Sequence, residues 1–513
     1  MVGERRRGVR TSRSLFLIIL LFSILIKVYL INLRKFPAGD EIWAYLLTKA
    51  DLKSIWFGTL SDFHGPFYFM LLRVIKLALP FELNIFFIRI ISLIFGIAAS
   101  FAVWVLASRV LGKKIGLIVF YLSLFLPGFI WASIYARYYS FLILLTTVSI
   151  ILFLNYINTE KLKNLIILVI ITTLGIYTHY YFFLIVFVFF IYLLSVREFR
   201  SLLRGWFLAI VSIFFLSLPL LFSFFVLPKP ELVGRGYNFI LKLPSVLITN
   251  LTSFETFIYL YYQGKPIFYI PVIISLWLST VLLLFWVLYI WKDKNKLLFL
   301  YLFLVPPAIL TLVSYAFNKP VLALGSLIIF LPSILILVGK GLNFTFKGSR
   351  IISLIFIISL FLSLIFFFQS SYTYSIPRKD FQFISDNLQD GDIIINSHFS
   401  SFLMSAYYLG SKVTNYGLHD EKTSTYPTQK TLGYNVITTE SLLNLKNRIW
   451  YLEPFYGTSD EAKAIKQILD NNFKLVKQEI FVPEKEYKDN FTFFNVYLYI
   501  PVNQYVRNGF QEP

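Results

Sequence analysis

The chain has 513 residues, of which 58% are hydrophobic and 19% aromatic, and it carries a formal net charge of +20. No soluble domain of this length needs so much apolar surface, so its repeated apolar runs of about 20 residues indicate a polytopic membrane protein. The sequence contains no cysteine, which excludes disulfides, thioether haem attachment and thiolate metal sites.

The positive charge is confined to the first part of the chain. Residues 1–370 contain 33 lysines and arginines against 11 acids, whereas residues 371–513 contain 14 against 16. A basic excess restricted to a membrane region is mainly a topology signal, so we expect no nucleic-acid partner. It also favours contact with membrane lipids that carry anionic head groups, including a lipid-phosphate substrate.

Five arginines precede the first apolar run, at 15–33. Positive charge before a first span places the N-terminus in the cytoplasm. No small-residue cleavage site follows this run, and many further runs do, so we expect a retained first helix rather than a cleaved signal peptide. The predicted location is a plasma or inner cell membrane, crossed many times.

Asp40 and Glu41 stand in the segment GDEIW, a few residues after this first run. They emerge on the external side, where ionisable groups beside a bilayer are by default functional candidates. A carboxylate fixed at a helix end can remove a proton from an attacking hydroxyl. Adjacent acids do not face one site from a helix, so we assign Asp40 the role of catalytic base and Glu41 a supporting role. The plain alternative is a solvated loop start.

His64, Gly65 and Pro66 lie in the long external loop 34–83. The Gly-Pro turn starts a predicted amphipathic helix at the interface, in FHGPFYFMLLRVIKLAL at 63–79. Amide groups at a helix N-terminus favour an anion, which makes His64 a candidate substrate-binding residue. The alternative is that His64 only caps the helix.

Three more candidates follow further along the chain. Arg137 and Tyr139 belong to the segment YARYY, on the external side of the run at 115–133. Arginine suits phosphate binding through several donors, although a snorkelling interface arginine is the alternative. His179 stands at the external turn between two short runs. Glu41, His64 and His179 share one side of the membrane, so a divalent metal is possible, but no spacing demands one, and no cofactor is certain.

Apolar runs recur along the chain and predict about eleven spans. They lie at roughly 15–33, 84–108, 115–133, 139–157, 163–177, 180–195, 206–227, 268–291, 297–316, 320–339 and 351–369. Five alternate connections carry clusters of lysine and arginine, and all five fall on the cytoplasmic side if the N-terminus does. An odd number of spans then puts the C-terminal segment outside.

The composition becomes polar and mixed after Phe368, which predicts a membrane domain at 1–370 and an external α/β domain at 371–513. Predicted helices lie at 381–388, 404–409 and 459–472. Three predicted strands, rich in β-branched and aromatic residues, lie at 392–396, 448–452 and 491–500. Their alternation favours a small α/β domain.

These segments together resemble the GT-C membrane glycosyltransferases, most closely the prokaryotic relatives of protein O-mannosyltransferases and the aminoarabinose transferase of lipid A. The segments are GDE at 39–41, FHGPFYFMLLR at 63–73, YARYYSFLILL at 135–145 and THYYFFLIVF at 178–187. The resemblance implies transfer of a sugar, with inversion, from a polyprenyl-phosphate carrier to an external acceptor. It also implies that Asp40 is the base, Glu41 its partner, and His64 and Arg137 the residues near the carrier phosphate.

Two departures from the family pattern concern the phosphate site. Tyr135 stands where the family often has an acid, and Leu324-Gly325-Ser326 stands where many members have Arg-Tyr. Lys319 and Arg235 are candidate replacements for that missing cation.

The sequence therefore predicts a polyprenyl-phosphate-dependent glycosyltransferase with an unknown protein, lipid or glycan acceptor. Two alternatives stay open. A transporter or flippase of lipid-linked sugars would carry polar residues or paired half-helices in mid-membrane, and the centres of these runs are nearly free of charge. A catalytically silent assembly protein of the same fold is suggested by Gly325-Ser326.

Overall fold

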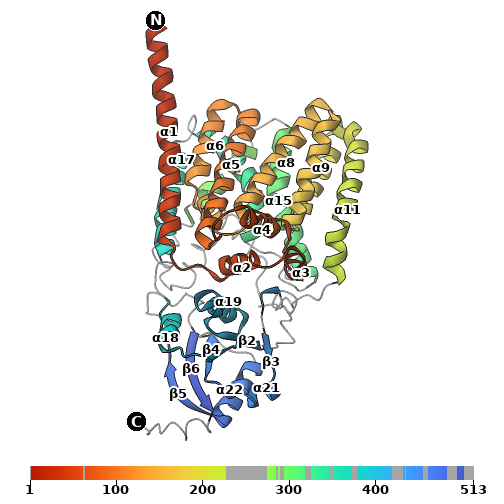
Figure 1. The fold of residues 1–513 in the computed structure, drawn as a ribbon. Coiled ribbons are helices and arrows are strands. Elements are labelled where there is room, and N and C mark those ends of the chain that lie inside the picture. Colours follow the sequence, from red (N-terminus) through yellow and green to blue (C-terminus); the bar gives the residue numbers. More distant parts are fainter. Residues whose placement is uncertain are drawn as a thin grey trace.

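The computed structural model describes residues 2–61, 64–226, 294–317, 325–345, 350–372, 378–418, 431–433, 435–454, 460–481 and 494–501, together with isolated residues between 274 and 288. A bundle of helices forms one end of the molecule, and a smaller α/β part, residues 378–501, forms the other (Figure 1). This confirms the predicted class of a polytopic helical membrane protein with a C-terminal α/β region.

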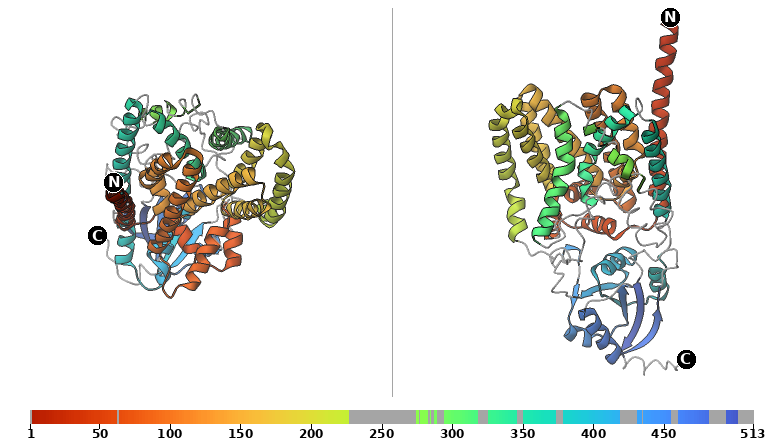
Figure 2. Two further views of the ribbon diagram at one scale, coloured as in Figure 1. Left: turned by 90° about the horizontal axis from the view of Figure 1, so that it is seen from above. Right: turned by 180° about the vertical axis from the view of Figure 1, so that it is seen from behind.

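The bundle is built from apolar helices that pack side by side (Figure 2). They are α1 (Val2–Leu33), α5 (Ile85–Leu111), α6 (Lys113–Phe125), α7 (Pro127–Ile134), α8 (Tyr139–Thr159), α9 (Leu162–Thr178), α10 (Phe182–Ser195), α11 (Leu203–Val226), α15 (Asn295–Ala316), α16 (Leu331–Thr345) and α17 (Arg350–Tyr372), with the 3-10 helices η1 (Arg197–Leu202) and η3 (Gly325–Phe330).

Fewer of these helices than predicted are long enough to span a membrane by themselves. Within the described residues, six helical segments are long and apolar enough to cross a membrane, and the pair α6 and α7, bent by 58°, would make a seventh. The runs that we predicted at 163–177, 180–195 and 320–339 form shorter apolar helices, below the roughly 20 residues that a straight span needs. Most of the run at 268–291 lies outside the described residues.

The bend between α6 and α7 falls at Leu126 and Pro127. Proline has no N–H group, so a helix commonly breaks where it stands, and Pro127 takes the first position of α7 instead. The break gives α7 its own direction, and α7 ends at Ile134, directly before the segment that carries Arg137.

Three short helices close the end of the bundle that faces the α/β part (Figure 1). They are α2 (Gly39–Leu47), α3 (Leu52–Ser61) and α4 (Phe67–Ala78). Helix α4 confirms the predicted helix after Gly65-Pro66, whereas α2 and α3 lie in a stretch that we predicted as loop. Helix α2 buries Ile42, Trp43 and Leu47, and this apolar face explains why the segment is helical.

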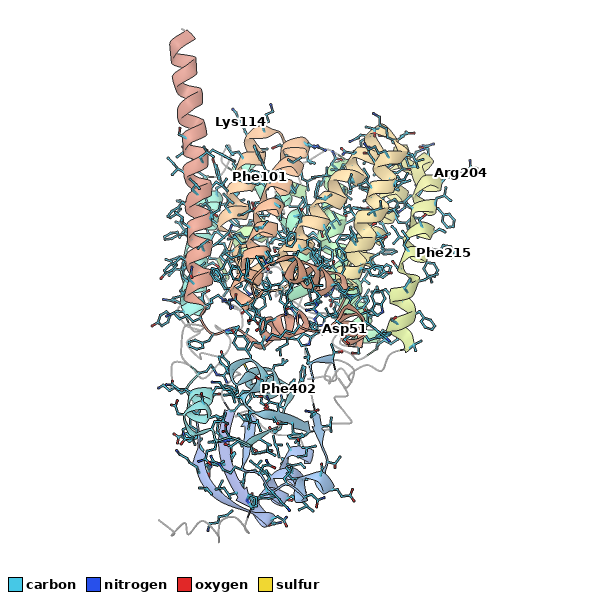
Figure 3. The ribbon with its side chains drawn as sticks, in the orientation of Figure 1. Asp51, Phe101, Lys114, Arg204, Phe215 and Phe402 are labelled. Atoms are coloured by element: carbon cyan, nitrogen blue, oxygen red, sulfur yellow. The ribbon has the colours of Figure 1, made fainter. Side chains whose placement is uncertain are left out.

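Figure 3 shows on which ends of the bundle three charged residues lie. Lys114, beside the α5–α6 connection, and Arg204, at the start of α11, lie at the end far from the α/β part, whereas Asp51 lies at the near end (Figure 3). The N-terminus of α1 also points away from the α/β part (Figure 1). The basic connections and the α/β part therefore lie at opposite ends, as the predicted topology requires.

The α/β part is built on one six-stranded sheet in the order β3-β2-β1-β4-β6-β5. Strands β3, β2, β1 and β4 run parallel to one another, whereas β6 pairs antiparallel with both β4 and β5. The strands are β1 (Ile393–Asn396), β2 (Thr414–Leu418), β3 (Asn435–Ile437), β4 (Ile449–Pro454), β5 (Phe473–Glu479) and β6 (Phe494–Pro501). The helices are α18 (Lys379–Asn387), α19 (Phe399–Tyr408), α21 (Thr439–Leu443) and α22 (Asp460–Asn472), with the 3-10 helix η5 (Gly410–Lys412).

The three predicted strands correspond to β1, β4 and β6, and the prediction missed β2, β3 and β5. Strand β5 exposes almost its whole length as an edge strand, and β3 has only three residues, so neither carries a clear apolar pattern. Helix α19 begins five residues before the helix that we predicted at 404–409.

The two faces of this sheet join different hydrophobic cores. Ile394, Trp450 and Leu498 belong to the large core that runs through the helix bundle. Ile393, Tyr451 and Tyr499 belong to a separate smaller core. One face of the α/β part is therefore packed continuously with the membrane helices, and the domain boundary at 370 stays a prediction.

Candidate active site

Asp40 and Glu41 occupy the first turn of α2, which begins at Gly39 after the N-cap residue Ala38. Their side chains have opposite environments, because Asp40 is exposed and Glu41 is completely buried. Acidic side chains in a first turn are favoured by the helix dipole. The two neighbouring acids therefore face different surroundings, and their separate catalytic roles stay a prediction.

Glu41 is held by four hydrogen bonds. Arg89 on α5 donates from Nε to Oε1 at 2.8 Å and from Nη2 to Oε2 at 2.6 Å. The backbone amides of Ala136 and Ala38 donate to Oε1 at 3.0 Å and to Oε2 at 3.1 Å. Burial by itself raises the pKa of Glu41, but the charge and hydrogen bonds of Arg89 outweigh it and lower this pKa to about 2. Glu41 is therefore ionised at any working pH.

Arg89 extends this anchor to the end of α1. Its Nη1 donates to the carbonyl oxygens of Arg34 at 2.5 Å and Ile31 at 3.4 Å. The Glu41–Arg89 pair thereby ties together α1, α2, α5 and the segment 135–138. Our sequence prediction missed Arg89, although a charged residue inside the apolar run at 84–108 is itself a signal of function.

Arg137 lies in the short connection between α7 and α8 and is only 3% exposed. Its Nη1 donates to the backbone oxygen of Asp40 at 3.4 Å, and its Nη2 lies 2.9 Å from Nε2 of His64. The guanidinium carbon stands 4.9 Å from the ring centre of Trp43 and 5.3 Å from that of Tyr138. Burial alone lowers the pKa of Arg137, but the nearby Asp40 carboxylate more than offsets this and keeps the pKa above its usual range.

His64 reaches Arg137 because its chain segment packs very closely against the end of α9. A Cβ atom on Gly65 would lie 2.3 Å from the carbonyl oxygen of Tyr177 and 2.6 Å from the carbonyl carbon of Thr178. Only glycine permits so close an approach. His64 itself is half-buried, and its ring lies 5.0 Å from that of Trp43.

His179 is buried at the C-cap of α9. Its Nδ1 accepts a hydrogen bond from the amide of Tyr181 at 3.2 Å. The ring of Tyr138 packs near both histidines, with centroids 5.5 Å from His179 and 6.0 Å from His64. Burial lowers the pKa of His179 to about 3, with smaller contributions from His64 and Arg137, so this side chain is neutral at physiological pH.

Tyr139 is buried at the start of α8, and its ring packs 4.6 Å from Trp131 and 5.0 Å from Tyr138. Trp43 and Tyr138 complete the group of rings around Arg137, and our sequence prediction had named neither. Aromatic residues at such depths are so common in membrane proteins that they gave no separate signal.

The six predicted residues thus gather where α2, the start of α4, the α7–α8 connection and the α9–α10 turn meet. Among these six residues, Asp40 carries a carboxylate that is exposed to solvent. Both carboxylate oxygens of Glu41 already accept hydrogen bonds from Arg89 and from backbone amides, so Glu41 is poorly suited as a metal ligand. Among the described residues, no group of three or more histidines and acids is placed to hold a metal ion. Lys319 and Arg235 lie outside the described residues.

Comparison with known proteins finds a family that matches part of the chain. Residues 64–223 match the family model described as dolichyl-phosphate-mannose-protein mannosyltransferase. This region contains His64, Arg137, Tyr139 and His179. No curated protein matches the chain at the level of sequence.

Two solved structures of one enzyme have a similar fold. ArnT from Cupriavidus metallidurans in the apo state is 12% identical, with a TM-score of 0.61, over 95% of this chain and 98% of that chain. ArnT bound to undecaprenyl phosphate is 12% identical, with a TM-score of 0.60, over 94% and 98%. The predicted resemblance to the GT-C membrane glycosyltransferases is confirmed, with the fold supported by ArnT and the glycosyltransferase class by the family match.

Proposed function

We propose that this membrane glycosyltransferase takes a sugar from a polyprenyl-phosphate carrier and transfers it, with inversion, to an acceptor on the external face of a plasma or inner membrane. Asp40 is the general base, and Glu41 positions it. His64 and Arg137 act at the carrier phosphate, and His179 and Tyr139 complete the substrate-binding region.

The observation that carries the proposal is the contrast between the two acids of α2. Asp40 is exposed on a helix whose first turn is fixed from within by the buried Glu41–Arg89 pair. A general base needs both access to the substrate and a fixed position. The backbone oxygen of Asp40 also contacts Arg137, so the candidate base and the candidate phosphate site are adjacent.

Arg137 supplies positive charge beside the departing group. Its two terminal nitrogens contact Asp40 and His64, and its Nε is buried without a partner in the described part of the chain. Because His64 is half-buried and Arg137 is only 3% exposed, a phosphate meets His64 first, with the Arg137 charge behind it. Undecaprenyl phosphate is bound by ArnT, a structural neighbour, and we infer that a carrier of the same class serves here.

The reaction is a single displacement at the anomeric carbon. The acceptor oxygen attacks this carbon, and its proton passes to Asp40. The bond between the anomeric carbon and the phosphate oxygen breaks, and both electrons of that bond leave with the carrier phosphate. Fixed positive charge at the place where negative charge grows is usually the largest catalytic contribution. Arg137 is that charge, and no covalent enzyme intermediate is needed.

We infer the orientation from the position of the basic connections. The basic connections lie far from the α/β part, and basic residues mark the cytoplasmic side. Asp40 and the α/β part are then external, and the lipid carrier reaches the site laterally from the membrane.

The test is turnover by the purified protein with labelled polyprenyl-phosphate sugars and an extract of the native membrane as acceptor. We expect transfer of label and an inverted anomeric configuration in the product, determined by NMR. Retention of configuration would exclude the single displacement. Movement of the intact lipid-linked sugar across proteoliposomes without transfer would favour a flippase, and neither activity would favour an assembly protein.

A further inference from the structure

Helix α19 of the α/β part lies directly against α2, the helix that carries Asp40 (Figures 1 and 2). The ring of Tyr407 meets the ring of Tyr45 edge-on, with centroids 5.6 Å apart. Near the start of α2, a Cβ atom on Gly39 would lie 3.9 Å from Cε of Met404. Two residues of α19, one helical turn apart, therefore touch both ends of α2.

Helix α19 is also held from within the α/β part. Arg378 and Asp380 form a buried ion pair at 2.5 Å, and Nη1 of Arg378 lies 3.7 Å from the sulfur of Met404. The ring of Tyr408 stacks on Phe381 of α18, with centroids 5.2 Å apart. These contacts fix α19 within the α/β part.

A second contact joins the same two parts at α3. The hydroxyl of Thr431 donates to the backbone oxygen of Ser54 at 3.2 Å. A Cβ atom on Gly58 would lie 2.8 Å from the same hydroxyl, so glycine leaves the space that Thr431 fills. The α/β part thus contacts α2 and α3, the first two of the three short helices that follow α1.

The packing of the sheet gives the same result on a larger scale. Met404 and Phe402 of α19 belong to the core that also contains Ile42 and Trp43 of α2. Apolar contacts therefore continue without a polar layer from one face of the sheet to the helix beneath Asp40.

We propose that α19 is a positioning element of the active site, in which Tyr407 and Met404 hold α2 in the orientation that presents Asp40 to the acceptor. The Glu41–Arg89 pair holds α2 from the membrane side, and α19 holds it from the other side. The catalytic consequence rests on the proposed function, whereas the fixation of α2 does not. A displacement of about 1 Å at a reacting group can cost on the order of a hundredfold in rate, so the α/β part acts on catalysis without contacting the substrate.

The experiment compares three variants of the full-length protein. Tyr407→Ala removes the ring contact, and Tyr407→Phe keeps the ring and serves as the rescue. Tyr416→Ala is the matched control, because Tyr416 is also a half-buried tyrosine of the α/β part but packs on the separate smaller core. Two measurements are made on each: amide hydrogen exchange in residues 39–47, and steady-state kinetics with donor and acceptor varied separately.

We expect Tyr407→Ala to speed exchange in α2 several-fold and to lower kcat by about tenfold or more, with the donor KM unchanged. Tyr407→Phe and Tyr416→Ala should behave as wild type in both measurements. Unchanged exchange in α2 would overturn the proposed fixation, even if no turnover could be measured for any form. Faster exchange with unchanged kcat would overturn its catalytic role. Wild-type protein without transferase activity would refute the proposed function instead, and exchange alone would then decide whether α19 fixes α2.

Discussion

The Glu41–Arg89 pair gives the sharpest prediction about how the site is held. Glu41→Gln leaves Arg89 charged, only 3% exposed, and without its counter-ion. Removal of one partner from a buried ion pair typically costs about 3–5 kcal/mol. Glu41 here accepts two charge-assisted bonds from Arg89 and two backbone bonds, so we expect a cost in the upper part of that range. Turnover should fall as well, because Ala136 directly precedes Arg137.

A double-mutant cycle separates this pair from general damage to the fold. Glu41→Gln, Arg89→Met and the double variant are compared by unfolding of the purified protein in a denaturing-detergent titration. The double variant should be more stable than the sum of the single effects predicts, with a coupling energy of about 1–3 kcal/mol. Single costs below about 1 kcal/mol that simply add would refute the claim that this pair anchors α2.

Three further predictions concern other parts of the chain. Burial lowers the folded-state pKa of His179 to about 3, so the free energy of unfolding should fall as pH drops from about 6.5 towards 3, by up to about 1.4 kcal/mol per pH unit. Melting curves at pH 4.5 and 7.5 should differ less for His179→Gln than for the wild-type protein. An equal difference would contradict a neutral buried histidine. Gly65→Ala would place a Cβ atom 2.3 Å from a backbone oxygen, whereas the Cβ atom of Gly39→Ala meets only an ordinary contact at 3.9 Å. The first substitution should lower the free energy of unfolding by about 1–3 kcal/mol or more, and the second should change it little. Equal thermal stability of the two variants would argue against the close packing of the His64 segment on α9. The topology is tested with single cysteines in place of Ser385 and Ser201, which are both exposed in a chain without native cysteine. An impermeant thiol reagent outside sealed cells should label Ser385→Cys alone. Labelling of Ser201→Cys would show that the orientation is the opposite of the predicted one.

The membrane class could be predicted from the sequence because long apolar runs are a local feature, and local features also suggested the candidate residues of the site. Long apolar runs, a Gly-Pro turn and a pair of acids after the first span are readable without knowledge of tertiary contacts. The different environments of Asp40 and Glu41 followed from helical geometry, since neighbouring residues on a helix point in different directions.

Other features depend on tertiary contacts and could not be read locally. Arg89 meets Glu41 across 48 positions of sequence, and nothing in either segment names the partner. Helices α2 and α3 are too short to show a clear period and are stabilised by the core beneath them. Strand β5 is a polar edge strand that forms by pairing with β6. The contact of α19 with α2 joins segments more than 350 positions apart.

The central claim is that Asp40 is the general base of an inverting sugar transfer, and the Asp40→Asn variant tests it most directly. The substitution keeps the size of the side chain and removes its basicity. The measurement is kcat with a labelled polyprenyl-phosphate sugar, beside donor binding to the same preparation. The account predicts a fall in kcat of about 10²–10⁴-fold, the usual contribution of general base catalysis, with donor binding retained. Near wild-type turnover by Asp40→Asn would contradict it and would move the base to another residue.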